Sequence, residues 1–321
     1  MYNSNQIYNQ LLPKLEELEV LRTEVLAQKK KALTICLIMG LVIVVVSFAV
    51  MSSAGIAGIF VAIIGVIILL FIYNGMVGDG VQKFRSSYKH KVISEIAQCI
   101  EPSIVYQPDH GISQSSFVDV GHYSNRIDRY KTEDHFSGQV GDTSLSFAEV
   151  HAQYKTTSTD SNGKTRTTWH TLFKGVMFTA DFHKNFNTWV TIKPDRESSL
   201  FGWVGTKMQK LSRSHIRMED PDFEENFKVN AGDDQEARYI LTPDMQQRLL
   251  AVKEEYGSGI IISFQRGCAY LTVPIKDDLF EGSLKESALS ESQVHKISAQ
   301  ITHFLKLVEA MNLNTRIWTK E

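Results

Sequence analysis

The chain has 321 residues, 43% of them hydrophobic, which leaves room for a membrane anchor and one or two folded units. Its charge is almost balanced, with 34 Lys and Arg against 36 Asp and Glu, so no strongly basic surface is implied and we expect no nucleic acid partner. Three scattered cysteines, Cys36, Cys99 and Cys268, exclude a disulfide framework or a cysteine-based zinc site and fit a reducing compartment.

Two apolar runs of membrane length lie in the first quarter of the chain. Residues 32–51 carry no charge and make about 30 Å of helix, which matches the hydrocarbon core of a bilayer. Residues 56–73 follow after only four residues and have no ionisable side chain before Tyr73. Two adjacent runs behind a polar segment are typical neither of buried core helices nor of a cleaved signal peptide. We therefore predict a transmembrane helical hairpin over 32–73.

The charges that flank the hairpin predict its orientation. Basic residues abut its two outer ends, at 29–31 before the first span and at Lys83 and Arg85 after the second, whereas the connecting loop has no charge. The positive-inside rule then places both chain ends in the cytoplasm and the short loop outside.

Helical periodicity continues on both sides of the predicted spans. Residues 1–31 are expected to include a cytoplasmic amphipathic helix, and residues 81–101 a membrane-proximal helix with an apolar side chain at every fourth position. Gly75, Gly78 and Gly80 are expected to break the helix after the second span, because each glycine costs about 1 kcal/mol in a helix relative to alanine. The two apolar stripes could pack on each other or on the rest of the protein, and the sequence leaves both alternatives open.

Residues 102–321 alternate between strand and helix patterns. Strands are predicted at 129–140, 143–156, 164–182 and 187–193, with Asn162-Gly163 as a hairpin turn, and a second hairpin at 260–264 and 268–273. Helices are predicted to begin at Pro221 and Pro243, each behind a capping residue, and a strongly amphipathic helix begins near Ser290. Consecutive strands joined by tight turns predict an α+β domain with a mainly antiparallel sheet.

Some side chains are candidates for chemistry. Glu149 and His151 share one face of a predicted strand, and His170 lies on the strand expected to pair with it. Such a group could transfer protons or hold a metal, whereas the structural alternative is a sheet whose buried face becomes polar at its end. Asp181 and His183 have the same spacing and are expected to end a strand.

Complete catalytic motifs are not found in the sequence. Gly111-Ile112-Ser113-Gln114-Ser115 lacks the last glycine of a nucleophile elbow, and no phosphate-binding loop or metalloprotease helix is present. We therefore assign no catalytic, cofactor-binding or metal-binding residue beyond the candidates.

A charged segment at 233–239 has two interpretations. It could be a recognition loop in which Arg238 contacts an anion beside Tyr239, or a capped turn in which Arg238 forms a structural ion pair.

Three motifs resemble a bacterial two-pass membrane-protein family catalogued as domain of unknown function 3137. They are Leu172-Phe173-Lys174-Gly175 through Ala180-Asp181-Phe182 with Phe186, then Met218 to Phe223 with Phe227, then Asp234 to Pro243. The resemblance implies a bacterial inner-membrane protein, with similarity over most of the chain. It implies no catalytic residue, because the family has no assigned activity, although it includes Asp181, Glu219, Arg238 and Tyr239 among the family-like positions.

Two functions remain as hypotheses. The preferred one is a non-enzymatic cytoplasmic interaction, scaffold or sensor domain tethered to the inner membrane, with the lipid bilayer and a protein or a second copy as partners. The alternative is a membrane-bound hydrolase or lipid-handling enzyme that uses Glu149, His151, His170 or Asp181.

Overall fold

The computed structural model describes residues 4–161, 163–182, 184, 186–195, 215–311 and 313. These residues form two compact units. The helical unit contains the described residues up to Ile96 together with Glu281–Lys296, and the sheet unit contains the other described residues. The predicted α+β class is confirmed, because two long apolar helices are followed by a nine-stranded antiparallel sheet with helices.

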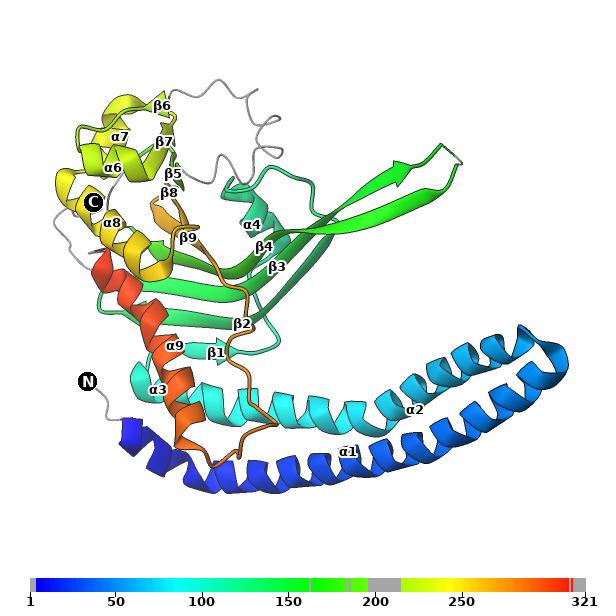
Figure 1. Cartoon of the computed structure of the whole chain (residues 1–321). Coiled ribbons are helices and arrows are strands. Elements are labelled where there is room, and N and C mark those ends of the chain that lie inside the picture. Colours follow the sequence, from blue (N-terminus) through cyan, green and yellow to red (C-terminus); the bar gives the residue numbers. More distant parts are fainter. Residues whose placement is uncertain are drawn as a thin grey trace. The chain divides into compact units, whose positions relative to one another are not determined.

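Two long helices make up most of the helical unit (Figure 1). Helix α1 runs without a break over Ser4–Ala54, and α2 runs over Ala57–Tyr88. Each contains a stretch long and apolar enough to cross a membrane, and only 6% of each stretch is buried within the protein. By length and composition, the two helices therefore indicate membrane anchoring.

The prediction that glycines break the helix after residue 73 is wrong. Helix α2 continues through Gly75, Gly78 and Gly80 and is followed directly by a π-helical turn over Lys89–Ile93 and by α3 over Ser94–Ile100. A Cβ atom at Gly80 would lie 2.7 Å from Gln28 Oε1 and 3.2 Å from Val25 Cγ2. Glycine at this position lets α1 approach closely, and the packing gained there offsets the low helix propensity.

The apolar stripes of the membrane-proximal segments are buried within the helical unit. On α1 the buried side chains include Ile7, Leu11, Leu15, Leu18 and Val25, and along the end of α2 and the helices after it they include Val77, Phe84, Tyr88, Val92 and Ile96. Ion pairs join the two segments, with 2.5 Å between Lys91 Nζ and Glu17 Oε2 and a further pair between Lys14 and Glu95. The stripes thus pack between α1 and the helices that follow the second span.

Residues 281–296 belong to the helical unit and are held against α1 by polar contacts. Tyr8 Oη donates to Leu289 O at 2.8 Å, and Glu19 accepts from Ala288 N at 2.6 Å. The Arg22 guanidinium, 2.7 Å from Glu19, and the Ala288 amide lower the pKa of Glu19 to about 2. Glu19 therefore stays ionised and fixes this segment at neutral pH.

All nine strands of the sheet unit form one antiparallel sheet. Their order is β1 (Val105–Gln107), β2 (Arg129–Val140), β3 (Thr143–Thr159), β4 (Thr165–Asp181), β9 (Cys268–Pro274), β8 (Ile261–Gln265), β5 (Val190–Pro194), β7 (Phe227–Ala231) and β6 (His215–Ile216). The hairpins β3–β4 and β8–β9 are confirmed, whereas the pairing of β4 with β9 joins strands far apart in sequence. Of the predicted β3–β4 turn, Asn162 lies outside the described residues.

Five helices complete the described part of the chain after α3. They are α4 (Gln114–Asp119), α6 (Pro221–Asn226), α7 (Asp234–Ile240), α8 (Pro243–Tyr256) and α9 (Glu291–Ala310). Both predicted caps are present, since Asp220 accepts from Asp222 N at 2.9 Å and Thr242 Oγ1 accepts from Met245 N at 3.3 Å. Helix α6 is short, because Phe227 already begins β7.

The two faces of the sheet carry different cores. On one face Phe147 lies 4.6 Å from Phe136 and 5.2 Å from Phe304 of α9, measured between ring centroids. On the other face α4 and the segments beside it cover an apolar cluster that includes Phe117, Val150 and Phe173. We call this second side the α4 face.

Candidate functional site

A cavity of about 410 Å³ opens on the α4 face of the sheet unit. Its walls come from the segment that leads into α4, from the end of that helix, and from strands β2, β3, β4 and β9 with the β8–β9 turn. The lining residues are Gly111, Ile112, Ser113, Ser116, Asp119, Val120, His135, Ser146, Met177, Thr179, Gln265, Arg266 and Tyr270.

Strand register explains why polar side chains meet at this cavity. Ser146 lies opposite Thr179, and Thr179 lies opposite Tyr270, so all three point to the same face. The neighbouring positions on β3 that share this face, Ala148 and Val150, belong to the apolar cluster under α4. The cavity therefore lies where the α4 face changes from apolar to polar.

The charges around the cavity nearly cancel. Arg266 Nη1 and Asp119 Oδ2 are 4.0 Å apart and have opposite charges. Burial, with a smaller contribution from His110, lowers the pKa of His135, so this imidazole is neutral at physiological pH. Burial also raises the pKa of Tyr270, whose hydroxyl therefore remains protonated and able to donate. The site suits a polar ligand without a large net charge.

Several polar groups of the cavity have no protein partner. Ser113 Oγ caps α4 by accepting from Ser116 N at 3.1 Å. By contrast, among the residues that the structure describes, the side chains of Ser146, Thr179 and His135 have no hydrogen-bond partner. Unpaired polar groups in a concave site are satisfied by water or by a ligand, so the arrangement is suited to binding.

Glu149 and His151 point to the face opposite the cavity. They occupy alternate positions of β3 with Phe147, so all three side chains share one face of the sheet. Glu149 Oε1 accepts a hydrogen bond from Leu279 N at 2.8 Å. Burial lowers the pKa of His151, with Lys174 as the next cause. The carboxylate thus holds a backbone amide, a contact that fits a structural role.

The structure does not bring His170 together with these two residues. Between Ala152 and Gln153 the register shifts, and Leu172 becomes an extra residue in β4. His170 consequently lies opposite Tyr154, which is three positions beyond His151 on β3. Its side chain is therefore on the α4 face, where its ring stacks on that of Tyr154 with 4.9 Å between the centroids. The predicted roles of Glu149, His151 and His170 remain predictions.

Asp181 is the last residue of β4 and lies opposite Cys268. It is two positions after Thr179 of the cavity wall, so the two side chains point to the same face of the sheet. It is near the cavity in sequence but does not line it. His183, its predicted neighbour, lies outside the described residues.

Arg238 and Tyr239 lie on helix α7, which Asp233 caps, so most of the segment 233–239 is helical. Arg238 Nε lies 3.3 Å from Asp234 Oδ2, and its Nη2 donates to Arg217 O at 3.0 Å. Lys184 Nζ donates to Tyr239 O at 3.0 Å and lies 4.9 Å from the centroid of the tyrosine ring. These contacts fit the ion-pair alternative for Arg238, and whether either residue has a function remains a prediction.

Sequence reasoning missed two polar sites of the sheet unit. The first is the cavity, whose Gly111 and Ser113 belong to the segment tested only as a nucleophile motif. The second is His122, whose Nδ1 lies 3.0 Å from Thr272 Oγ1 and whose Nε2 lies 2.9 Å from Ser263 Oγ. No local pattern marks either site, because the cavity walls come from separate segments of the chain and the partners of His122 are 141 and 150 residues away.

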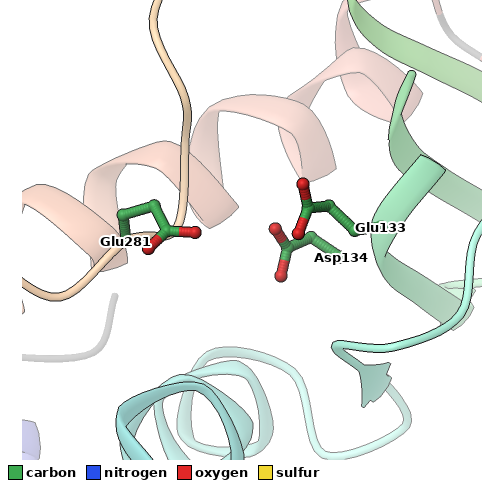
Figure 2. Close-up of side chains that lie close together, drawn as sticks. All are labelled: Glu133, Asp134 and Glu281. Carbon is green, nitrogen blue, oxygen red and sulfur yellow. The ribbon is translucent and has the colours of Figure 1, made fainter. Parts of the chain in front are cut away.

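Two acidic residues of β2, Glu133 and Asp134, lie at a bulge in the strand (Figure 2). Asp134 has a positive φ of 58° and accepts a hydrogen bond from Tyr106 Oη, whereas Glu133 pairs with Lys131 at 2.5 Å. Glu281, also drawn there, belongs to the helical unit, where it lies 2.9 Å from Lys89 Nζ. Each carboxylate has a partner within its own unit.

Comparison with known protein families gives one match. Residues 171–313 match the family described as "Protein of unknown function (DUF3137)". The predicted resemblance is confirmed over this segment, which contains Asp181, Arg238 and Tyr239. The DUF3137 match covers less than half of the chain, not most of it as predicted, and the two long apolar helices lie outside it. Among the residues that line the cavity, the matched segment contains Met177, Thr179, Gln265, Arg266 and Tyr270. The other lining residues precede this segment in the sequence.

Comparison with solved structures finds a distant similarity to the mycobacterial trehalose monomycolate transport factor A. The TM-score is 0.31 and the identity 8%, over 68% of this chain and 95% of that one. No curated protein sequence matches the chain significantly.

Proposed function

We propose that this chain is a bacterial inner-membrane protein whose cytoplasmic α+β part is an interaction or sensor domain held at the membrane by a two-helix anchor. The observation that carries the proposal is the apolar surface of α1 and α2. Leu41 is 71% exposed and Phe71 76% exposed, and neighbouring apolar side chains along both spans are similarly uncovered. Such surfaces are stable in lipid and costly in water.

The tight connection between the spans supports the anchoring role. Gly58 packs against α1, where an added Cβ would lie 2.5 Å from Ser47 O, and Gly65 packs against Ile43 in the same way. No Asp, Glu, Lys or Arg occurs within 32–73 to move an ion or a proton across the bilayer. Basic residues at 29–31 and at Lys83 and Arg85 favour cytoplasmic chain ends.

The cavity on the α4 face supports the sensor form of the proposal. Its unpaired hydroxyl groups and the neutral His135 suit a small polar ligand, and a protein partner or a second copy would receive the signal. The hydrolase alternative gains no such support, because Glu149 and His170 lie on opposite faces of the sheet.

Cysteine labelling in intact cells tests the anchor and its orientation. In a variant whose three native cysteines are replaced, single cysteines are placed at Ser53 in the loop and at the exposed residues Glu16 and Glu254. An impermeant maleimide is expected to label Ser53→Cys in intact cells, and the other two only after the membrane is opened. Labelling of Glu16→Cys or Glu254→Cys in intact cells would contradict the orientation.

The interaction role has a separate test. The full chain is extracted in detergent at native abundance, cross-linked and purified. Recovery of a specific partner or of a cross-linked dimer is expected, and the absence of both would contradict this part of the proposal.

A further inference from the structure

The β3–β4 hairpin extends beyond the rest of the sheet as a two-stranded arm (Figure 1). Strand β2 pairs with β3 only as far as Gln153, and β9 pairs with β4 only as far as Gly175. Beyond these points no third described strand pairs with either, and β3 and β4 pair with each other up to Thr159 and Thr165. We call the described residues of 154–170 the arm.

Both faces of the arm are open to solvent. Every described residue from Thr157 to Trp169 is exposed, although successive side chains of a strand point to opposite faces. An isolated two-stranded ribbon is marginally stable in water, so a partner surface would stabilise it.

The arm is basic in a chain whose net charge is −2. It carries Lys155, Lys164 and Arg166 against a single acidic residue, Asp160. Neither Lys164 nor Arg166 has an ion-pair partner among the described residues, and Asp160 Oδ1 accepts from the Lys164 backbone amide at 2.9 Å. The cationic side chains of the arm are therefore available to an anionic partner.

An aromatic and hydroxyl surface accompanies these charges. Trp169 is 41% exposed, the Arg129 guanidinium lies 4.2 Å from its ring centroid, and Lys155 Nζ lies 6.0 Å from it. By strand register, Lys155, Trp169 and the threonines at 157, 159, 165 and 167 share one face of the arm, whereas Arg166 and the threonines at 156 and 168 lie on the other. Threonine hydroxyls can donate to phosphate oxygens, so each face offers both a cation and hydroxyl donors. Tryptophan prefers the headgroup region of a bilayer, and lysine and arginine are attracted to anionic lipids.

We propose that the arm binds the anionic phospholipid headgroups of the bilayer in which the chain is anchored. This inference rests on the proposed membrane anchor, because the tether gives lipid phosphates a high effective concentration near the arm. Soluble phosphate-bearing polymers such as RNA have similar chemistry but no such advantage.

The attraction to an anionic surface sets the size of the expected effect. Each Lys or Arg near such a surface strengthens binding by roughly fivefold, so removal of three charges weakens it by about 100-fold. Because the interaction is electrostatic and lies in water, high salt is expected to weaken it too.

Fluorescence of Trp169 in proteoliposomes tests the proposal on the full chain. The Trp169 signal is the difference between wild type and Trp169→Phe, and the quencher is a brominated lipid. Quenching is expected in phosphatidylcholine mixed with phosphatidylglycerol, with little in phosphatidylcholine alone. The combined variant Lys155→Gln, Lys164→Gln and Arg166→Gln is expected to lose it, with an unchanged circular dichroism spectrum because all three residues are exposed.

A matched control variant removes the same number of positive charges at positions outside the arm. Lys276→Gln, Lys296→Gln and Lys306→Gln remove three exposed cations outside the arm and are expected to leave the quenching intact. Equal quenching in neutral and anionic vesicles, or equal loss in both triple variants, would overturn the inference. So would release of the arm from the vesicles by competing RNA at low concentration.

Carbonate extraction of the same vesicles separates the two proposals. Release of the wild-type chain by carbonate would contradict the anchor itself. A retained chain whose Trp169 is not quenched would contradict only the role of the arm.

Discussion

At the scale of single residues, burial decides the chemistry of the ionisable groups. His122 is 2% exposed, and both of its ring nitrogens are within hydrogen-bond distance of hydroxyl groups. Burial, with Lys193 as a smaller cause, lowers the pKa of His122 to about 3. This histidine is therefore neutral in the folded protein and joins the segment after α4 to β8 and β9.

His122 is expected to make the stability of the sheet unit depend on pH. Below pH 6.5 the unfolded chain binds a proton that the folded chain binds only near pH 3, so lower pH favours unfolding. The free energy of unfolding should fall by about 1.4 kcal/mol per pH unit within this window. The measurement is urea unfolding of the full chain in detergent, followed by circular dichroism at several pH values.

Substitution of His122 separates this effect from other titrations. His122→Gln should cost about 1–3 kcal/mol near neutral pH, because Ser263 or Thr272 loses a partner, and it should remove the His122 part of the pH slope. His295→Gln, at an exposed position of α9, is the control and should keep the slope. An unchanged slope in His122→Gln would refute the assignment.

At the scale of elements, the long-range pairing of β4 with β9 depends on one glycine. Gly175 has a φ of 154°, and an added Cβ would lie 2.1 Å from Val273 O and 2.7 Å from Ile275 N. Both neighbours are backbone atoms, which cannot move without disturbing the end of β9. The glycine thus permits the close contact that positions the cavity strands.

Gly175→Ala is expected to destabilise the sheet unit by about 2–4 kcal/mol, because strain and a backbone clash act together. Gly121→Ala is the matched control: its φ of 74° is also positive, but no atom lies within 4 Å of the added Cβ. It should cost about 1 kcal/mol from conformational strain alone. Urea unfolding compares the two variants, and equal losses would show that the contact with β9 contributes nothing.

At the scale of the whole molecule, the exposed apolar surfaces of the two long helices favour lipid over water as their surroundings. Leu41 and Ile64 lie within the two spans, and both are more than half exposed. In water these surfaces would drive aggregation, whereas in a bilayer they are solvated by lipid.

A double substitution in the full-length chain tests whether the two apolar helices insert into a membrane. Leu41→Arg with Ile64→Arg should weaken membrane insertion by about 6 kcal/mol, since an arginine in mid-membrane costs about 3 kcal/mol. The protein should then leave the membrane fraction on carbonate washing, whereas Leu41→Ala with Ile64→Ala should stay. Retention of the arginine variant would argue against a membrane-spanning hairpin.

Features that depend on neighbouring residues could be predicted from the sequence. The apolar runs predicted the two long helices, the turn residues predicted the hairpins β3–β4 and β8–β9, and Asp220 and Thr242 predicted two helix starts. These features follow from length, turn chemistry and capping, which act over a few residues.

Which side chains meet follows from the tertiary fold and could not be predicted from the sequence. The extra residue Leu172 in β4 places His170 on the face opposite His151, and the pairing of β4 with β9 brings Tyr270 to Ser146 and His135 around the cavity. Gly80 likewise continues a helix that its propensity disfavours, because α1 packs against it. These arrangements depend on contacts between distant segments and on strand register, because a shift of one residue moves a side chain to the other face of the sheet.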